Sequence, residues 1–165
     1  MTGLAAGDHA PDFVLRDQHG QEVSLSGVLA DRAALVVFYP FAFTGVCTGE
    51  LAALHAGRAD FDNDRVALLV VSTDSIYAQR VFAEREGYEL RLLSDFWPHG
   101  AVASSYGVLD ERSGAALRGT FLVGCDGVIR WSVVHPIPDA RDPDDYRAAI
   151  ADLDGAAAAG PAPVG

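Results

Sequence analysis

The residues around one cysteine have types and spacings that could support thiol chemistry. Thr44 stands three positions before Cys47, Glu50 stands three positions after it, and Pro40 precedes all of them. A thiol acts as a nucleophile only in its ionised form. The unpaired backbone N–H groups and the positive dipole end in the first turn of a helix both stabilise such an anion. The pattern therefore predicts a nucleophilic Cys47, provided that a helix begins near Thr44.

A buried strand and a helix must flank this segment to hold it in place. Residues 35–39 read Leu-Val-Val-Phe-Tyr, a continuous apolar run that is typical of a strand buried on both faces. Large apolar side chains recur from Cys47 onward at spacings that fit one face of a helix. We therefore predict a single helix from about Thr44 to Phe61.

The rest of the chain alternates between strand-like and helix-like segments, which indicates an α/β domain. Further strands are predicted at 66–71, 119–123 and 128–133, and further helices at 74–85, at 99–106 and from Asp142 onward. Apolar stretches at 13–15 and 23–25 flank a turn-like segment and predict an N-terminal hairpin. Residues 155–165 contain only Ala, Gly, Pro and one Val, too little apolar bulk to pack, so we expect a disordered tail after a domain of residues 1–154.

The composition excludes several classes of function. The chain has 165 residues, of which 50% are hydrophobic and 21% charged, as in one globular domain. Its formal charge of −11 repels nucleic-acid phosphates and anionic lipid headgroups. The longest apolar run, Ala33 to Tyr39, is too short to cross a bilayer, and the N-terminus lacks the pattern of a signal peptide. We therefore expect a cytoplasmic protein that binds neither nucleic acid nor membranes.

The residue types also argue against metals and cofactors. All 12 basic residues are arginines, which excludes lysine Schiff bases and phosphate-loop lysines. Cys47 and Cys125 form neither a CxxC motif nor a cluster of metal ligands. We expect no metal and no cofactor. None of the five histidines lies in the motif. The sequence therefore leaves a Cys–His hydrolase open but points to no particular histidine as its base.

The segment Pro40 to Cys47 resembles the active-site segment of the peroxiredoxin family, which reads Pro, three residues, Thr, two residues, Cys. The stretches Gly7 to Phe13 and Tyr106 to Val108 agree with that family, and Arg118-Gly119-Thr120-Phe121 resembles its segment with the active-site arginine. The stretch Leu93-Ser94-Asp95-Phe96-Trp97-Pro98-His99-Gly100 is most similar to the one-cysteine alkyl hydroperoxide reductase E type. The resemblance covers residues 3 to 154 and implies a thioredoxin-like fold, with a central mixed sheet flanked by helices.

The resemblance implies a thiol peroxidase that reduces hydrogen peroxide and organic hydroperoxides. Cys47 would attack the peroxide and become a sulfenic acid, which an external thiol or redoxin reduces. Thr44 would hydrogen bond to the peroxide or thiolate, and Arg118 would donate to the oxygens as charge develops on the leaving oxygen. Glu50 is placed to hold an arginine fork, and Pro40 would form a wall of the pocket. A homodimer is implied as well.

The position of the second cysteine bears on how the sulfenic acid is reduced. Some relatives carry a resolving cysteine five residues after the first, where this chain has Ala52, and none stands near the C-terminus. If Arg118 lies at the site, seven residues of straight strand place Cys125 about 23 Å away. A disulfide needs Cα atoms within about 7 Å. We therefore predict a one-cysteine mechanism in which Cys125 has no part.

Each of these residues also has a simpler interpretation. Cys47 could be an inert core cysteine, Thr44 a helix cap, and Arg118 a surface strand residue. Phe96 and Trp97 could be core aromatics or could form an interface near the site. Two other functions stay open, namely a redox sensor whose oxidised cysteine alters partner binding, and a thiol–disulfide oxidoreductase. The second lacks a partner thiol in the helix after Cys47.

Overall fold

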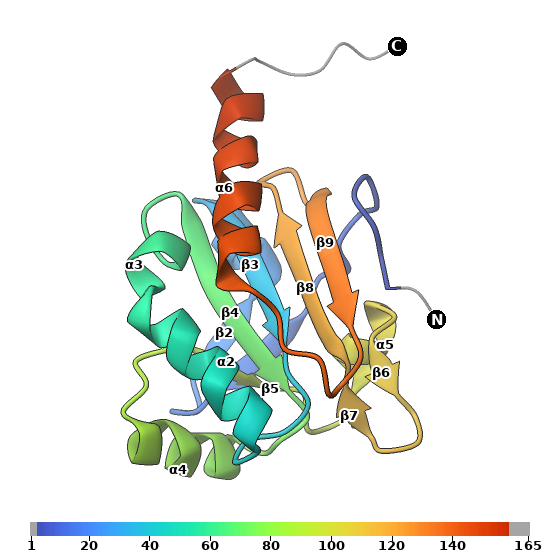
Figure 1. Cartoon of the computed structure of the whole chain (residues 1–165). Helices are drawn as coiled ribbons and strands as arrows, with labels where there is room; N and C mark the ends of the chain where they lie inside the picture. Colours follow the sequence, from blue (N-terminus) through green and yellow to red (C-terminus); the bar gives the residue numbers. More distant parts are fainter. Residues whose placement is uncertain (1–2, 159–165) are drawn as a thin grey trace.

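The computed structural model describes residues 3–158, in which seven strands form one mixed sheet. Its order is β2-β1-β5-β4-β3-β8-β9, and two short strands, β6 and β7, pair separately (Figure 1). The strands are β1 (Val14–Asp17), β2 (Glu22–Ser24), β3 (Ala33–Phe38), β4 (Val66–Ser72), β5 (Leu92–Ser94), β6 (Leu109–Asp110), β7 (Ala115–Ala116), β8 (Arg118–Val123) and β9 (Ile129–His135). The helices are α1 (Leu25–Leu29), α2 (Gly45–Ala56), α3 (Arg58–Phe61), α4 (Ile76–Glu86), α5 (Ala101–Ser105) and α6 (Pro143–Ala158).

β3 and β4 are buried along their whole length, as their continuous apolar runs predicted, and β8 beside them is buried as well. β3 pairs with β4 in parallel and with β8 antiparallel, and every residue of the three is buried. Successive side chains of a strand point to opposite faces. Leu35 and Val37 accordingly enter one core cluster, whereas Val36 and Phe38 enter the other. Full burial of one such side chain contributes about 1.5–3 kcal/mol, so these strands form a rigid base for the loops at their ends.

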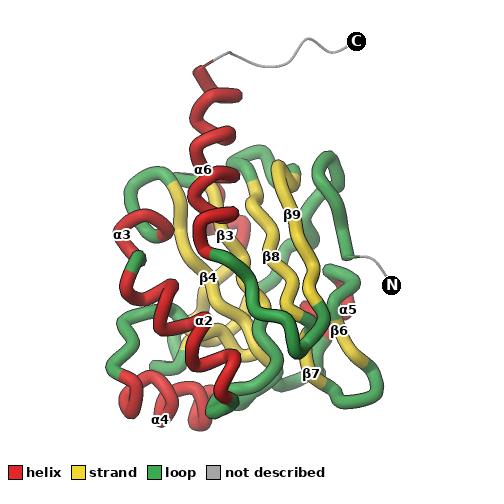
Figure 2. Tube along the Cα trace, in the orientation of Figure 1, coloured by secondary structure: helices red, strands yellow, loops and turns green. Residues whose placement is uncertain are grey.

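Helices cover both faces of the sheet, which confirms the predicted thioredoxin-like architecture. Residues of α2, α4 and α6 pack on the face of Leu35, and residues of α1 and α5 pack on the opposite face (Figures 1 and 2). The N-terminal hairpin is confirmed too, since β1 pairs antiparallel with β2 and Leu15 lies opposite Val23. None of the helices within residues 3–158 is long and apolar enough to cross a membrane.

The segment predicted as one helix from Thr44 to Phe61 is instead two helices with a break at Gly57. Gly57 has φ −99° and ψ 17°, outside the helical range, and α3 starts immediately after it. A Cβ atom at this position would lie 2.6 Å from Nη2 of Arg147 and 3.1 Å from the ring of Phe61. The break therefore lets Arg147 and the fully buried Phe61 approach the backbone closely.

The last helix extends beyond the predicted end of the domain. α6 begins at Pro143, as expected, and continues to Ala158, four residues past the boundary placed at residue 154. Residues 159–165 of the predicted tail lie outside the described residues, so their disorder stays a prediction.

Candidate active site

Cys47 lies in the first turn of α2, just after the loop that leaves β3. Thr44 occupies the N-cap position with an extended backbone, at φ −93° and ψ 149°, and Cys47 is the third residue of the helix. The predicted start of the helix is therefore confirmed. The thiol is free and its residue fully buried. First-turn N–H groups have no intrahelical partner, so Cys47 lies where the helix favours an anion.

The side chain of Thr44 makes no capping hydrogen bond to α2, although Thr44 occupies its N-cap position. Its hydroxyl donates to the Phe41 carbonyl at 3.1 Å, and no capping bond from it to α2 is present. The carbonyl of Thr44 accepts from the Thr48 hydroxyl at 2.8 Å. The exposed Thr44 hydroxyl therefore leaves the helix N-terminus uncovered, and its oxygen can still accept a further hydrogen bond.

Arg118 and Glu50 meet in the interior beside α2. Glu50 lies one helical turn after Cys47, and spacings of three place side chains on neighbouring parts of a helix surface. Nη1 of Arg118 donates to Oε1 of Glu50, and Nε of Arg118 donates to the Ile137 carbonyl at 2.5 Å. Both side chains are buried, which contradicts a surface position for Arg118. The remaining nitrogen, Nη2, makes no hydrogen bond within residues 3–158.

The arginine fork on Glu50 comes from Arg141, which the sequence analysis missed. Nε and Nη2 of Arg141 each donate to one Glu50 oxygen at 3.0 Å, and its backbone N–H donates at 2.7 Å. Its Nη1 donates to the Gly119 carbonyl and the Thr120 hydroxyl on β8. Arg141 lies between the end of β9 and the start of α6, and Figure 2 shows the loop that joins these two elements. Nothing in its sequence neighbourhood marks it, because its partner is 91 residues away.

The cluster of Arg118, Glu50 and Arg141 carries a net positive charge. Burial alone would raise the pKa of Glu50, but the hydrogen bonds and charge of Arg141, together with the charge of Arg118, lower it below its ordinary value. Glu50 is therefore ionised at neutral pH, and two guanidinium groups face one carboxylate. One positive charge is left in a buried position around Glu50, which lies one helical turn after Cys47. A buried charge of this kind stabilises an anion that forms next to it.

Several apolar residues precede Cys47 on the loop and in the first turn of α2. Pro40 is buried at the end of β3, as a wall residue would be. Phe41, Phe43 and Val46 expose 38%, 47% and 40% of their surface, which leaves an apolar rim on the loop and on the first helical turn. None of the hydrogen bonds among the described residues joins a histidine to Cys47, which gives no support to a Cys–His pair.

Neither a group of metal ligands nor the second cysteine adds to this site within residues 3–158. In the described part of the chain, no three His, Cys, Asp or Glu side chains are arranged to hold a metal ion. Cys125 is exposed in the turn between β8 and β9, beyond the end of β8 that is opposite to Arg118.

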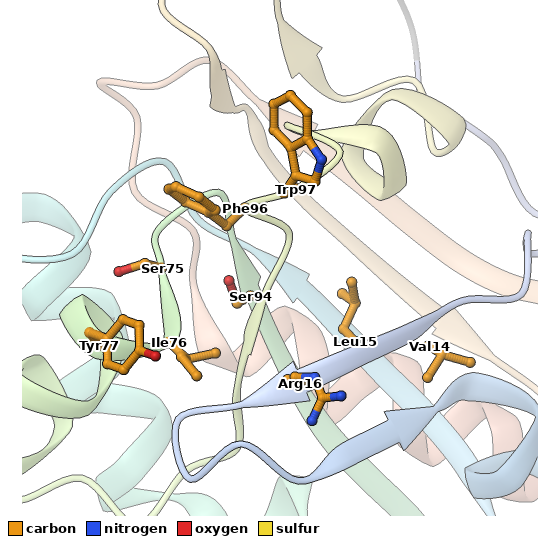
Figure 3. A pocket seen from close by; sticks show the side chains of 9 residues that line it. All are labelled: Val14, Leu15, Arg16, Ser75, Ile76, Tyr77, Ser94, Phe96 and Trp97. Atoms are coloured by element: carbon orange, nitrogen blue, oxygen red, sulfur yellow. The ribbon is translucent and has the colours of Figure 1, made fainter.

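A hollow whose lining does not include Cys47 lies at the N-terminal end of α4. It has a volume of about 570 Å³ and is bordered by β1, the first residues of α4 and the loop that follows β5 (Figure 3). Phe96 and Trp97 on that loop expose 52% and 82% of their surface, so they are not core residues. Tyr77 on α4 is 75% exposed on the same hollow.

The chain is similar to known peroxiredoxins in both sequence and structure. The AhpC/TSA family model matches residues 6–132. Alkyl hydroperoxide reductase E of Mycobacterium tuberculosis is 43% identical over 150 residues, which cover 91% of this chain and 98% of the relative. The chloroplastic 2-Cys peroxiredoxin BAS1 of Hordeum vulgare is 30% identical over 149 residues, which cover 84% of this chain and 70% of the relative. The crystal structure of Enterococcus faecalis AhpC superposes with a TM-score of 0.85 at 27% identity, over 98% of each chain.

Proposed function

The chain belongs to the AhpC/TSA family of peroxiredoxins, which are thiol peroxidases, and on this premise we propose a one-cysteine reaction cycle centred on Cys47. The Cys47 thiolate attacks one oxygen of hydrogen peroxide or an organic hydroperoxide, and the O–O bond breaks as the S–O bond forms. Sulfur loses two electrons to the peroxide, and the leaving oxygen takes a proton to give water or an alcohol. The product on the enzyme is a sulfenic acid.

The observation that carries this proposal is the positively charged cluster of Arg118, Glu50 and Arg141 beside a thiol at a helix N-terminus. An inert core cysteine has no need of it. In the proposed reaction Arg118 donates to the peroxide oxygens through Nη2, and Thr44 hydrogen bonds to the peroxide or thiolate. Glu50 and Arg141 orient Arg118, and Pro40 forms a wall of the pocket.

An external thiol completes the cycle. It attacks the sulfenic sulfur, water leaves, and a second thiol then releases Cys47 from the mixed disulfide. The relatives include proteins named as 2-Cys peroxiredoxins, so family membership leaves this step open. The exposed position of Cys125, at the far end of β8 from Arg118, supports an outside reductant. We place this chemistry in the cytoplasm, where thiol reductants are abundant.

The apolar rim supports organic hydroperoxides as substrates besides hydrogen peroxide. Phe41, Phe43 and Val46 together offer exposed apolar surface on the loop and the first helical turn that lead to Cys47. An alkyl or aryl group bound there gains about 25 cal/mol for each Å² of apolar surface removed from water, a gain that hydrogen peroxide does not share.

A second copy of the chain is the partner that the hollow of Figure 3 fits best. A two-fold interface presents the same patch on both partners, so the patch must be complementary to itself. Here a strongly exposed Trp97 stands at the border of an apolar hollow of about 570 Å³ on one face (Figure 3). Aromatic side chains of this kind dominate the energetics of interfaces. We therefore propose a homodimer in which Trp97 of each copy enters the hollow of the other.

Steady-state peroxide consumption with a supplied low-molecular-weight thiol tests the proposed cycle. We expect turnover by the parent and by Cys125→Ser, and none by Cys47→Ser, because an alcohol offers essentially no nucleophilic anion near neutral pH. Turnover by Cys47→Ser would refute the assignment of the nucleophile. Oxidation of Cys47 without turnover would instead favour the redox sensor, and turnover that depends on Cys125 would refute the one-cysteine cycle.

A further inference from the structure

The loop from Pro40 to Thr44, which places Thr44 and the start of α2, has a strained backbone. Phe43 has φ +67°, and within residues 3–158 it is the one residue other than glycine with a positive φ. A residue other than glycine is disfavoured in this region and persists only where its surroundings hold it. The loop therefore needs contacts that keep it in this conformation.

Two contacts from outside the loop hold it. Oδ2 of Asp74 accepts the backbone N–H of Ala42 at 2.8 Å, directly before the strained residue. The ring of Phe43 packs edge-on against Phe82 of α4, with 5.1 Å between the ring centres. The first contact is a hydrogen bond with a charged acceptor, which is stronger than a neutral one and fixes direction as well as distance.

Asp74 is itself fixed by its neighbours in the turn between β4 and α4. The Ser72 hydroxyl donates to the same Oδ2 atom at 2.7 Å, and the Ser94 hydroxyl donates to the Asp74 carbonyl at 2.6 Å. Ser72 in turn accepts from the buried Gln79 amide at 3.0 Å, and this amide also donates to the Leu93 carbonyl. The carboxylate therefore stands at the end of a hydrogen-bonded chain anchored in β4, β5 and α4.

We propose that Asp74 is a positioning residue for the peroxide reaction, because its carboxylate holds the strained loop that sets Thr44 against the peroxide. This inference rests on the peroxidase function proposed above. Asp74 lies two residues beyond the end of β4 and acts through Ala42 rather than on the reacting atoms. Loss of the bond would let Phe43 relax toward ordinary backbone angles and shift Thr44, while leaving the Cys47 thiol in place.

Asp74→Ala and Asp74→Asn separate this role from a structural one. The alanine variant removes the acceptor, whereas the asparagine variant keeps an oxygen that can accept from Ala42 and Ser72. Two rate constants are compared for each, the one with hydrogen peroxide and the one with iodoacetamide. Alkylation needs a thiolate but not the alignment of Thr44 and Arg118. Asp126→Ala is the matched control, since Asp126 also accepts one backbone N–H and one arginine in a turn, but between β8 and β9.

For Asp74→Ala we expect the peroxide rate constant to fall about 10- to 100-fold, as for a reacting group displaced by about 1 Å. The alkylation rate constant of Asp74→Ala should stay within about threefold of the parent value. The same holds for both rate constants of Asp74→Asn and for both of Asp126→Ala. Equal losses in both reactions of Asp74→Ala, or no loss in either, would overturn the inference.

If Asp74→Ala does not fold, Ser72→Ala takes its place. This variant removes the second donor to Oδ2 of Asp74 and must lower the peroxide rate constant more than the alkylation rate constant. An unchanged ratio of the two rate constants there overturns the inference as well. The two claims fail in different ways. A parent enzyme that does not react with peroxide would refute the peroxidase function, and the role of Asp74 with it, whereas a reactive parent with no selective loss in these variants would refute the role of Asp74 alone.

Discussion

Cys47 owes its expected reactivity to groups that act on the peroxide as well as on the thiol. A less basic thiolate is also a weaker nucleophile, so a larger thiolate population cannot by itself make a fast peroxidase. Stabilisation of the leaving oxygen has to supply the rest, and a buried guanidinium does so more strongly than one in water. We propose Arg118 for this role, since Glu50 and the Ile137 carbonyl hold two of its nitrogens and Nη2 makes no hydrogen bond within residues 3–158.

Arg118→Ala should lose about 2 to 4 kcal/mol of transition-state stabilisation, measured as a fall of roughly 30- to 900-fold in the second-order rate constant with peroxide. Glu50 keeps Arg141 as its partner in this variant, so the fold should survive. Alkylation of Cys47 by iodoacetamide, which forms no oxygen anion, should fall much less. If both reactions slow by the same factor, Arg118 acts only on the thiolate. Arg130→Ala, at an exposed ion pair on β9, serves as the control and should change neither rate.

Glu50 should make the stability of the fold depend on pH in a defined window. Its pKa is lowered from the ordinary 4.5, so the carboxylate stabilises the folded chain above that pH, and this contribution is lost as the pH falls through the lowered value. Glu50→Gln leaves two buried guanidinium groups without their counter-charge, and we expect a loss of about 3 kcal/mol at pH 7. Urea unfolding of both proteins between pH 7 and pH 3 should show this difference shrinking below pH 4.5. A constant difference would contradict the assignment.

At the scale of secondary structure, the elements that could be predicted are those whose pattern is local. β3 and β4 follow from continuous apolar runs, and the hairpin follows from a turn between two short apolar stretches. The strands β5, β6 and β7 and the helix α1 were not predicted, because segments this short show no clear period and, unlike the hairpin strands, were not recognised from a neighbouring turn. The break at Gly57 was missed, although a glycine inside a helical pattern is a local signal of a helix end.

The same distinction applies to the site. Pro40, Thr44 and Cys47 lie within one short segment, so spacing alone could bring them together with the start of a helix. Arg141 could not be found in this way, because its contacts with Glu50 exist only once the loop after β9 has folded back. Phe43 gave no signal either, since a positive φ is usually marked by glycine and here is held by tertiary contacts.

The direction of β8 separates the two cysteines. β8 runs antiparallel to β3, with Thr120 opposite Val37 and Val123 opposite Ala34. Cys47 follows the end of β3, whereas Cys125 lies beyond Val123, next to the start of β3. A strand of this length spans about 20 Å, well beyond the reach of a disulfide. The arrangement of the sheet thus predicts that Cys47 and Cys125 do not form an intramolecular bridge.

At the scale of the whole molecule, the net charge opposes association of two chains, whereas exposed apolar surface favours it. Two chains of formal charge −11 repel, so a homodimer needs the apolar gain from the hollow beside Trp97. Salt screens the repulsion and should therefore strengthen association.

Trp97→Asp should convert the dimer largely to monomer, because it removes the exposed ring and adds a charge where the two copies meet. Sedimentation velocity at about 50 and 500 mM salt measures this, with Ala59→Asp, an equal change of charge on the exposed surface of α3, as the control. A parent that is monomeric at both salt concentrations, or a Trp97→Asp variant that stays dimeric, would contradict the proposed interface.

Mass spectrometry of the protein after one equivalent of hydrogen peroxide, with and without a low-molecular-weight thiol, tests the central claim most directly. Without thiol we expect one added oxygen on Cys47, trapped as a sulfenic acid, with Cys125 unchanged and no bridge between the two in non-reducing peptide maps. With thiol present, the oxidised species should become a mixed disulfide on Cys47 and then disappear. A Cys47–Cys125 disulfide in high yield would contradict the one-cysteine cycle, and oxidation that falls on Cys125 while Cys47 stays reduced would contradict the site itself.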